Sequence, residues 1–180
     1  FSWQLLYDLF AMGTPAVLEK MMPGTGTSLF SRLMLINTFL AGLLAVKAVS
    51  FFSQLRFALF TGVLCTAGGA ALAHSSLSLP MLIAGTTIWS IGEVAFAVVC
   101  IFIMGRLTHE TKKPGFWFAV STAIMASGRM AAGVMIFPLI VNAGKPSVLF
   151  LGIGVVAVML TGVFLWGSRS AGHLFESEAR

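Results

Sequence analysis

The sequence predicts an all-α integral membrane protein, folded as a bundle of six transmembrane helices, and two observations carry this prediction. Hydrophobic residue types make up 58% of the 180 residues, while charged types make up only 9%. A water-soluble domain carries about 25% charged residues, so this composition argues against a soluble enzyme or a nucleic-acid-binding module. The apolar residues also form long continuous runs, without the alternation of apolar and polar residues that marks membrane β-strands.

The apolar runs divide the chain into six predicted spans. A transmembrane helix requires roughly 20 apolar residues, and the runs are close to this length. Short polar segments with glycine, proline, serine or charged residues separate them. The predicted spans are residues 1–22, 28–52, 57–73, 79–104, 115–141 and 148–166, and residues 167–180 form a polar C-terminal tail.

The first span ends at the turn-forming sequence Pro-Gly-Thr-Gly-Thr, and a stripe of polar residues runs along one side of it. The residues that recur at helical spacing are Gln4, Asp8, Met12, Pro15 and Glu19. Such a stripe must face protein or water rather than lipid. It therefore predicts a spanning helix that lines a cavity, to which Tyr7 can contribute. The alternative is an amphipathic helix lying on the membrane surface.

The second and third spans carry features that are typical of helix packing. Asn37 is a polar amide within the second span, and such residues more often bind a neighbouring helix than a ligand. Arg32 is close to the start of that span, where its side chain can reach the membrane interface. In the third span, a stripe of small residues lets helix backbones approach closely. Its members are Gly62, Thr66, Gly69 and Ala73.

The fourth and fifth spans each contain a charged residue near the middle. Glu93 follows Trp89 by one helical turn in the fourth span, and Arg129 lies in the fifth. An ionisable group inside a bilayer costs roughly 3 kcal/mol, so both are candidates for function. The two spans are consecutive and antiparallel, which predicts an ion pair or a shared polar cavity. A midplane carboxylate commonly carries a proton or cation, whereas Arg129 can equally be a structural partner that fixes helix register.

The basic residues of the loops predict the orientation of the chain. The charged loop at residues 105–114 and the loop at residues 53–56 lie on the same side as the tail. Together they hold more Lys and Arg than the opposite loops, where Lys145 is the main basic residue. Basic loops stay in the cytoplasm, so both ends of the chain are expected to be cytosolic. The formal net charge of +5 is explained by these loops and not by a nucleic-acid partner.

No motif for catalysis, a metal or a cofactor is found in the sequence. Cys65 and Cys100 lie inside apolar runs and have no CxxC spacing. The sequence contains no phosphate loop, no HExxH motif and no Ser-His-Asp arrangement. We therefore expect neither an enzyme nor a bound cofactor.

Three short sequences resemble the C-terminal half of a major facilitator superfamily transporter, particularly its bacterial drug:proton antiporter-like members. They are Ile-Asn-Thr-Phe-Leu at residues 36–40, Ile-Trp-Ser-Ile-Gly-Glu at residues 88–93 and Lys-Lys-Pro-Gly-Phe at residues 112–116. In that family, an Asn-containing eighth helix and a Gly-Glu pair in the tenth helix are familiar. The resemblance implies that the six spans are helices seven to twelve, with spans one and four lining a central cavity.

The resemblance implies a secondary active transporter that exports a small molecule in exchange for protons by alternating access. Glu93 would bind the coupling ion or the substrate, and the expected neighbouring site residues are Asp8, Arg129, Asn37, Trp89 and Gln4. The expected partners are the lipid bilayer, an unidentified small molecule and a preceding six-helix half, since the chain opens at Phe1 within an apolar run. The expected location is the bacterial cytoplasmic membrane.

A non-transporting subunit within a larger membrane protein complex is the alternative function. Two departures from the family pattern favour it. Arg129 stands where family members usually have small residues, and residues 53–56 lack the usual Gly-Arg-rich loop motif.

Overall fold

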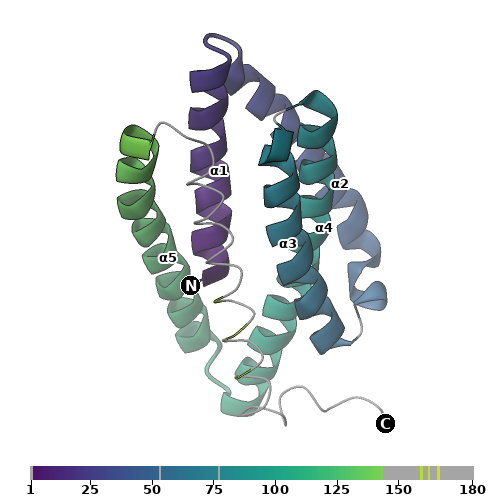
Figure 1. The fold of residues 1–180 in the computed structure, drawn as a ribbon. Helices are drawn as coiled ribbons and strands as arrows, with labels where there is room; N and C mark the ends of the chain where they lie inside the picture. Colours follow the sequence, from purple (N-terminus) through teal and green to yellow (C-terminus); the bar gives the residue numbers. More distant parts are fainter. Residues whose placement is uncertain are drawn as a thin grey trace.

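The computed structural model describes residues 2–52, 54–76 and 78–143, together with the single residues Met159, Gly162 and Trp166. The regular structure of the described residues is entirely α-helical, which confirms the all-α prediction for this part of the chain. Its helices are α1 (Ser2–Met21), α2 (Gly26–Phe51), α3 (Leu55–Ser76), α4 (Leu79–Thr111) and α5 (Pro114–Ala143) (Figure 1). The predicted sixth span and the predicted tail lie outside the described residues, apart from those three single positions.

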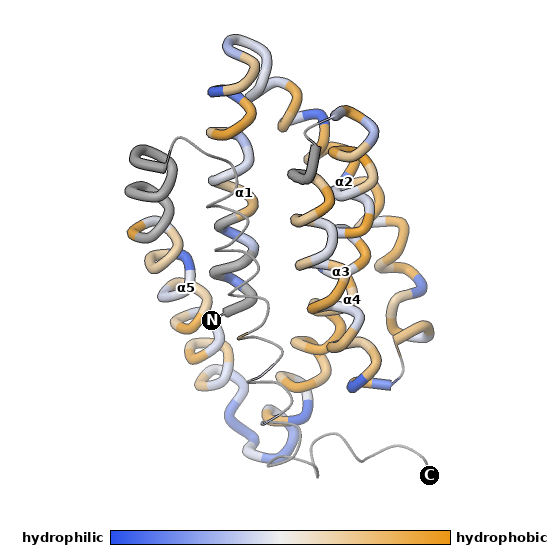
Figure 2. The backbone as a smooth tube through the Cα atoms, viewed as in Figure 1, coloured by the Kyte–Doolittle hydropathy of each residue, from blue (hydrophilic) through white to orange (hydrophobic). Residues whose placement is uncertain are grey.

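Successive helices run in opposite directions through the bundle. The start of α1, the α2–α3 turn and the α4–α5 turn lie at one end, and the α1–α2 and α3–α4 turns lie at the other (Figure 1). Hydrophilic residues gather at the α4–α5 turn, while apolar residues dominate the middle of α2, α3 and α4 (Figure 2). This arrangement brings Arg56 and Arg106 to the same end of the bundle.

The helices form two groups. In the first group, α3 packs along α4 over most of its length, and α2 packs on α4 as well. In the second group, α1 lies beside α5 (Figure 1). The α1–α2 turn joins the two groups, whereas α4 and α5 touch only sparsely. Apart from the contact of α1 with α2, few residues of the two groups approach each other closely.

Three helical segments are long and apolar enough to cross a membrane. They are Gly26–Phe51, Leu55–Ala73 and Leu79–Thr111. On α2, many large apolar side chains point away from the rest of the protein, among them Leu35, Phe39, Leu43, Val46 and Val49. Water would strongly disfavour so continuous an apolar surface, and lipid would not.

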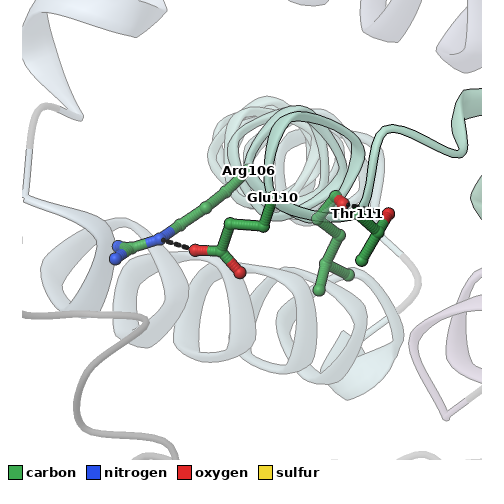
Figure 3. A network of polar contacts seen from close by, with 4 residues as sticks. Arg106, Glu110 and Thr111 are labelled. Carbon is green, nitrogen blue, oxygen red and sulfur yellow. Dashed lines mark hydrogen bonds and ion pairs between the residues drawn. The ribbon is translucent and has the colours of Figure 1, made fainter.

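The charged loop predicted at residues 105–114 is shorter than expected, because α4 continues to Thr111. Arg106 Nε donates a hydrogen bond to Glu110 Oε1 at 2.9 Å, one helical turn further on. Opposite charges four residues apart stabilise a helix, so these residues extend α4 instead of ending it. The Thr111 hydroxyl donates to the Leu107 carbonyl at 2.6 Å on the neighbouring turn (Figure 3). The helix ends at Lys112, whose φ of 53° is left-handed.

One further loop prediction needs correction. Residues 74–76 were expected to lie between the third and fourth spans, but they complete the last turn of α3. Glu19, the last member of the polar stripe on the first span, also caps the α1–α2 turn. Its carboxylate accepts the Gly24 N–H at 2.6 Å and both the N–H and the hydroxyl of Thr27 at 2.9 Å. These contacts satisfy backbone donors that the start of α2 would otherwise leave unpaired.

The stripe of small residues on α3 brings the backbones of α3 and α4 together, as predicted. A Cβ atom added to Gly69 would lie 2.5 Å from the backbone nitrogen of Trp89 and 2.6 Å from the carbonyl oxygen of Gly85. A Cβ atom on Gly85 would lie 2.5 Å from the backbone nitrogen of Ala73. Only glycine fits at such separations, so these positions fix how closely the two helices approach.

Candidate functional site

Gln4 and Asp8 form a buried polar pair on α1. Gln4 Nε2 donates a hydrogen bond to Asp8 Oδ2 at 2.8 Å, and both residues are only 4% exposed. They are four residues apart, so they lie on the same side of the helix. The carboxylate of Asp8 therefore points into protein, as the polar stripe of the sequence predicts.

Arg129 on α5 is the charged partner of Asp8. Arg129 Nε lies 3.6 Å from Asp8 Oδ2, and its side chain is 63% exposed while that of Asp8 is 5% exposed. A direct Glu93–Arg129 pair, one of the two predicted arrangements, is not found among the described residues. The reason lies in the packing of α5 against α1, where Ala132 belongs to the same apolar cluster as Phe10 and Leu18. Arg129 is three residues before Ala132, so it lies on the same side of α5 and is directed toward α1.

Glu93 belongs to a second polar cluster, between α2 and α4. Asn37 Nδ2 on α2 donates to Glu93 Oε2 at 3.1 Å. The Ser90 hydroxyl lies 2.6 Å from Asn37 Oδ1 and 2.8 Å from the carbonyl oxygen of Thr86. Asn37 and Ser90 are buried, and Glu93 is half-buried. Asn37 thus joins α2 to α4, which agrees with its expected role as a contact between helices.

Trp89 lies in the aromatic contact between α1 and α4. Its ring stacks on Phe10, with centroids 4.2 Å apart and planes at 16°, and the Tyr7 ring lies 6.1 Å away. Trp89 is 1% exposed, and its Nε1–H lies near the Glu93 carboxylate without forming a close hydrogen bond with it. Because a buried donor normally has an acceptor, Glu93 is the natural partner of this indole.

Tyr7 stands between the two polar clusters. Its phenol is close enough to Glu93, Asp8 and Arg129 to interact electrostatically with all three. The six predicted site residues therefore form two clusters with an aromatic contact between them. Gln4, Asp8 and Arg129 belong to the α1–α5 side, whereas Asn37 and Glu93 bridge α2 and α4 and Trp89 reaches across from α4.

The chain matches no protein-family model, no curated protein and no solved structure. The resemblance to one transporter family therefore stays a prediction, and the site is interpreted from its own geometry.

Sequence reasoning missed three members of the site, namely Thr86, Ser90 and Phe10. The first two were detectable, because Thr86, Ser90 and Glu93 are spaced four and three residues apart and so share one face of α4. Phe10 gives no such signal, since it is one of 16 phenylalanines and only the packing of α1 against α4 distinguishes it.

The arrangement offers proton binding and hydrogen bonding rather than a nucleophile. No group of three or more acidic, cysteine or histidine side chains gathers in the described ranges. The available groups are two carboxylates in different surroundings, one guanidinium, one phenol and one indole N–H near Glu93. Asp8 has a cation beside it, while Glu93 is hydrogen-bonded by a neutral amide.

Proposed function

We propose that this chain is the membrane bundle of a secondary active transporter, in which Glu93 binds and releases the proton that drives movement of a small molecule. The observation that carries the proposal is the contrast between the two carboxylates. Asp8 is buried beside Arg129, so its charge is compensated. Glu93 lies in a helix apolar enough to cross a membrane, and it has no ion-pair partner among the described residues.

No ion pair compensates the charge of Glu93 among the described residues, and the side chain lies on a helix apolar enough to cross a membrane. A carboxylate held there by neutral hydrogen-bond donors can take up a proton from one side of the membrane and release it to the other. Intramembrane carboxylates commonly mark such proton pathways. Glu93 lies on α4 in the first group of helices, and Tyr7 of α1 in the second group lies near it, so a change at Glu93 can alter how the two groups pack.

The proposal also includes the membrane in which the chain lies and its orientation there. The chain would cross the cytoplasmic membrane several times, with the α2–α3 and α4–α5 turns in the cytosol. Three apolar helices support insertion into a membrane, and Arg56, Arg106 and the lysines at the α4–α5 turn support this orientation.

Flux measurements with Glu93→Gln test the proposal. The full chain is placed in membrane vesicles, a pH gradient is imposed, and the movement of a panel of small molecules and of protons is followed. We expect Glu93→Gln to abolish pH-driven flux while the protein remains folded, because glutamine keeps the shape and cannot titrate. Glu110→Gln removes an exposed glutamate from the same helix and is expected to leave flux unchanged. Undiminished flux in a folded Glu93→Gln protein would contradict the proposal.

A non-transporting subunit of a larger membrane complex is the second candidate, and the exposure of Arg129 favours it. A guanidinium facing lipid at mid-membrane is costly, so this surface of α5 is expected to meet protein or water. Photo-crosslinking from Met130, beside Arg129, can be compared with crosslinking from Val46 on the outer side of α2. Both side chains are highly exposed. A protein adduct at residue 130 and only lipid adducts at residue 46 would favour the subunit.

A further inference from the structure

We propose that Thr86, Ser90 and Asn37 form a hydrogen-bond relay that rearranges when Glu93 gains or loses a proton, so that α2 and α4 stay joined in both states. This inference rests on the proposed function, because it concerns how the proton-binding residue is held. Asn37 and Ser90 act in it as positioning residues.

The relay follows from the number of protons that Ser90 can donate. A serine hydroxyl has one O–H donor and two acceptor lone pairs. Yet Ser90 Oγ lies within hydrogen-bond distance of two acceptors, Asn37 Oδ1 at 2.6 Å and the Thr86 carbonyl at 2.8 Å. A single proton cannot fully serve both acceptors. Ser90 therefore has a choice between two partners.

With Glu93 ionised, the relay has one arrangement. The carboxylate can only accept, so the Asn37 amide directs its NH₂ group toward Glu93. The carbonyl oxygen of Asn37 then faces Ser90, and the Ser90 hydroxyl donates to it. The orientation of the amide is thus fixed from both sides.

With Glu93 protonated, the same atoms support a second arrangement. One proton from solution binds a Glu93 carboxylate oxygen, and the new O–H donates to Asn37 Oδ1 once the amide has turned over. The Asn37 NH₂ group then donates to a lone pair of Ser90, and the Ser90 proton moves to the Thr86 carbonyl by rotation of the hydroxyl. The O–H bond of Glu93 forms as an O–H bond of the donating hydronium ion breaks and releases water, and no other covalent bond changes. Each donor that the relay uses has an acceptor in both arrangements.

The remaining surroundings of Glu93 allow this exchange. The Tyr7 phenol on α1 lies near Glu93 and also near Asp8 and Arg129, and the Trp89 indole lies near Glu93 on α4. On the α3 side, the neutral Thr66 faces Gly92, the residue before Glu93. Thr66 and Ser90 are fully buried, so the α3–α4 contact cannot readily move to accommodate a new charge. A change of hydrogen-bond direction requires only rotation of two side chains.

Infrared difference spectroscopy on the full chain in lipid vesicles tests the relay. The sequence has two asparagines, Asn37 and Asn142, so an Asn142→Gln background with ¹³C-labelled asparagine isolates the Asn37 carbonyl band. Spectra are recorded between acidic and alkaline buffer. The carboxyl band of Glu93 is identified by its loss in Glu93→Gln. We expect the Asn37 band to shift with the same midpoint as the Glu93 band.

Ser90→Ala is the decisive variant, and Ser127→Ala is its matched control. Ser127 also donates to a backbone carbonyl, but it lies on the exposed side of α5. We expect Ser90→Ala to abolish the shift of the Asn37 band and Ser127→Ala to preserve it. If Ser90→Ala does not fold, the relay is tested by comparing the spectra of the protein that retains Ser90 with those of Glu93→Gln. The Asn37 band should shift in the first protein and stay constant in the second.

The outcomes separate the relay from the proposed function. A Glu93 band that titrates while the Asn37 band stays constant overturns the relay and leaves proton binding at Glu93 intact. A shift that survives in folded Ser90→Ala also overturns the relay. A Glu93 carboxyl band that never titrates overturns both proposals.

Discussion

The α3–α4 contact and the α1–α4 contact show two different ways of joining helices in one bundle. Between α3 and α4, Gly69, Gly85 and Gly92 remove the side chains, and the backbones meet. Between α1 and α4, the side chains of Phe10, Tyr7 and Trp89 span the distance. The first contact has no room for a methyl group, whereas the second consists of rings that can rotate and slide.

This difference indicates which part of the molecule can move. A close-packed backbone contact resists any change in separation, because every displacement forms a clash or a void. A contact made by side chains can change by rotamer motion at lower cost. The α2–α3–α4 group is therefore expected to stay rigid, while the α1–α5 pair shifts against it.

Gly69→Ala should have the largest effect on stability, because it disrupts the close backbone contact between α3 and α4. Its new methyl group meets backbone atoms of Trp89 and Gly85, which cannot turn away. We expect a loss of stability near the upper end of the roughly 1–3 kcal/mol typical of overpacking. Gly68→Ala is the control, since a Cβ atom there meets nothing within 4 Å. Equal unfolding midpoints for the two variants, measured in detergent, would show that the backbones are not in close contact.

Asp8→Asn should have the next largest effect, because it leaves Arg129 without its charged partner. Breaking a buried pair costs about 3–5 kcal/mol, and the exposure of Arg129 reduces this to roughly 1–2 kcal/mol. Combining Asp8→Asn with Arg129→Met should restore part of the loss, which a double-mutant cycle of unfolding free energies measures. Additive losses would mean that the pair does not join α1 to α5.

Phe10→Leu weakens the aromatic contact between α1 and α4 while keeping an apolar side chain. Loss of the stacked ring is expected to cost about 1 kcal/mol. Phe118→Leu, at a residue that is highly exposed on α5, should change the unfolding free energy much less. The fluorescence of Trp89 in a variant lacking the other three tryptophans provides an independent measure. Unaltered emission in Phe10→Leu would argue against the stack.

Glu110→Gln should have the smallest effect on the unfolding free energy, and it serves as a reference for the other variants. The Arg106–Glu110 pair lies at the exposed end of α4, where such pairs contribute about 0.3–0.5 kcal/mol. High salt should remove the difference between this variant and the original chain. A loss as large as that of Asp8→Asn would mean that the end of α4 is buried against something else.

Local patterns in the sequence predicted the helices and part of the site. Apolar runs fix where helices form, and helical spacing correctly placed Gln4 and Asp8 on an inward side of α1 and small residues on one face of α3. These features depend on neighbours within one helix, so the sequence contains them.

Contacts between residues on different helices could not be predicted from such local patterns. Arg129 was matched with Glu93 because their helices are consecutive, yet α5 packs against α1 and brings Arg129 to Asp8. Which helices become neighbours depends on the fit of whole surfaces. The predicted end of the fourth helix was wrong for a different reason. Arg106 and Glu110 were interpreted as loop charges, although their spacing of four residues is that of a helix-stabilising pair.

The length of α4 has a mechanical consequence. Its 33 residues extend about 50 Å, against roughly 30 Å for the hydrocarbon core of a bilayer. In a bilayer the helix would have to tilt or protrude, and its Arg106–Glu110 end would reach the headgroups or the water beyond. Glu110 is 17 residues beyond Glu93 (110 − 93), or about 25 Å along the same continuous helix. A lever of this length converts each degree of rotation at Glu93 into about 0.4 Å of travel at its tip. A spin label at Thr111 would record small reorientations of the helix around Glu93 as displacements at its far end.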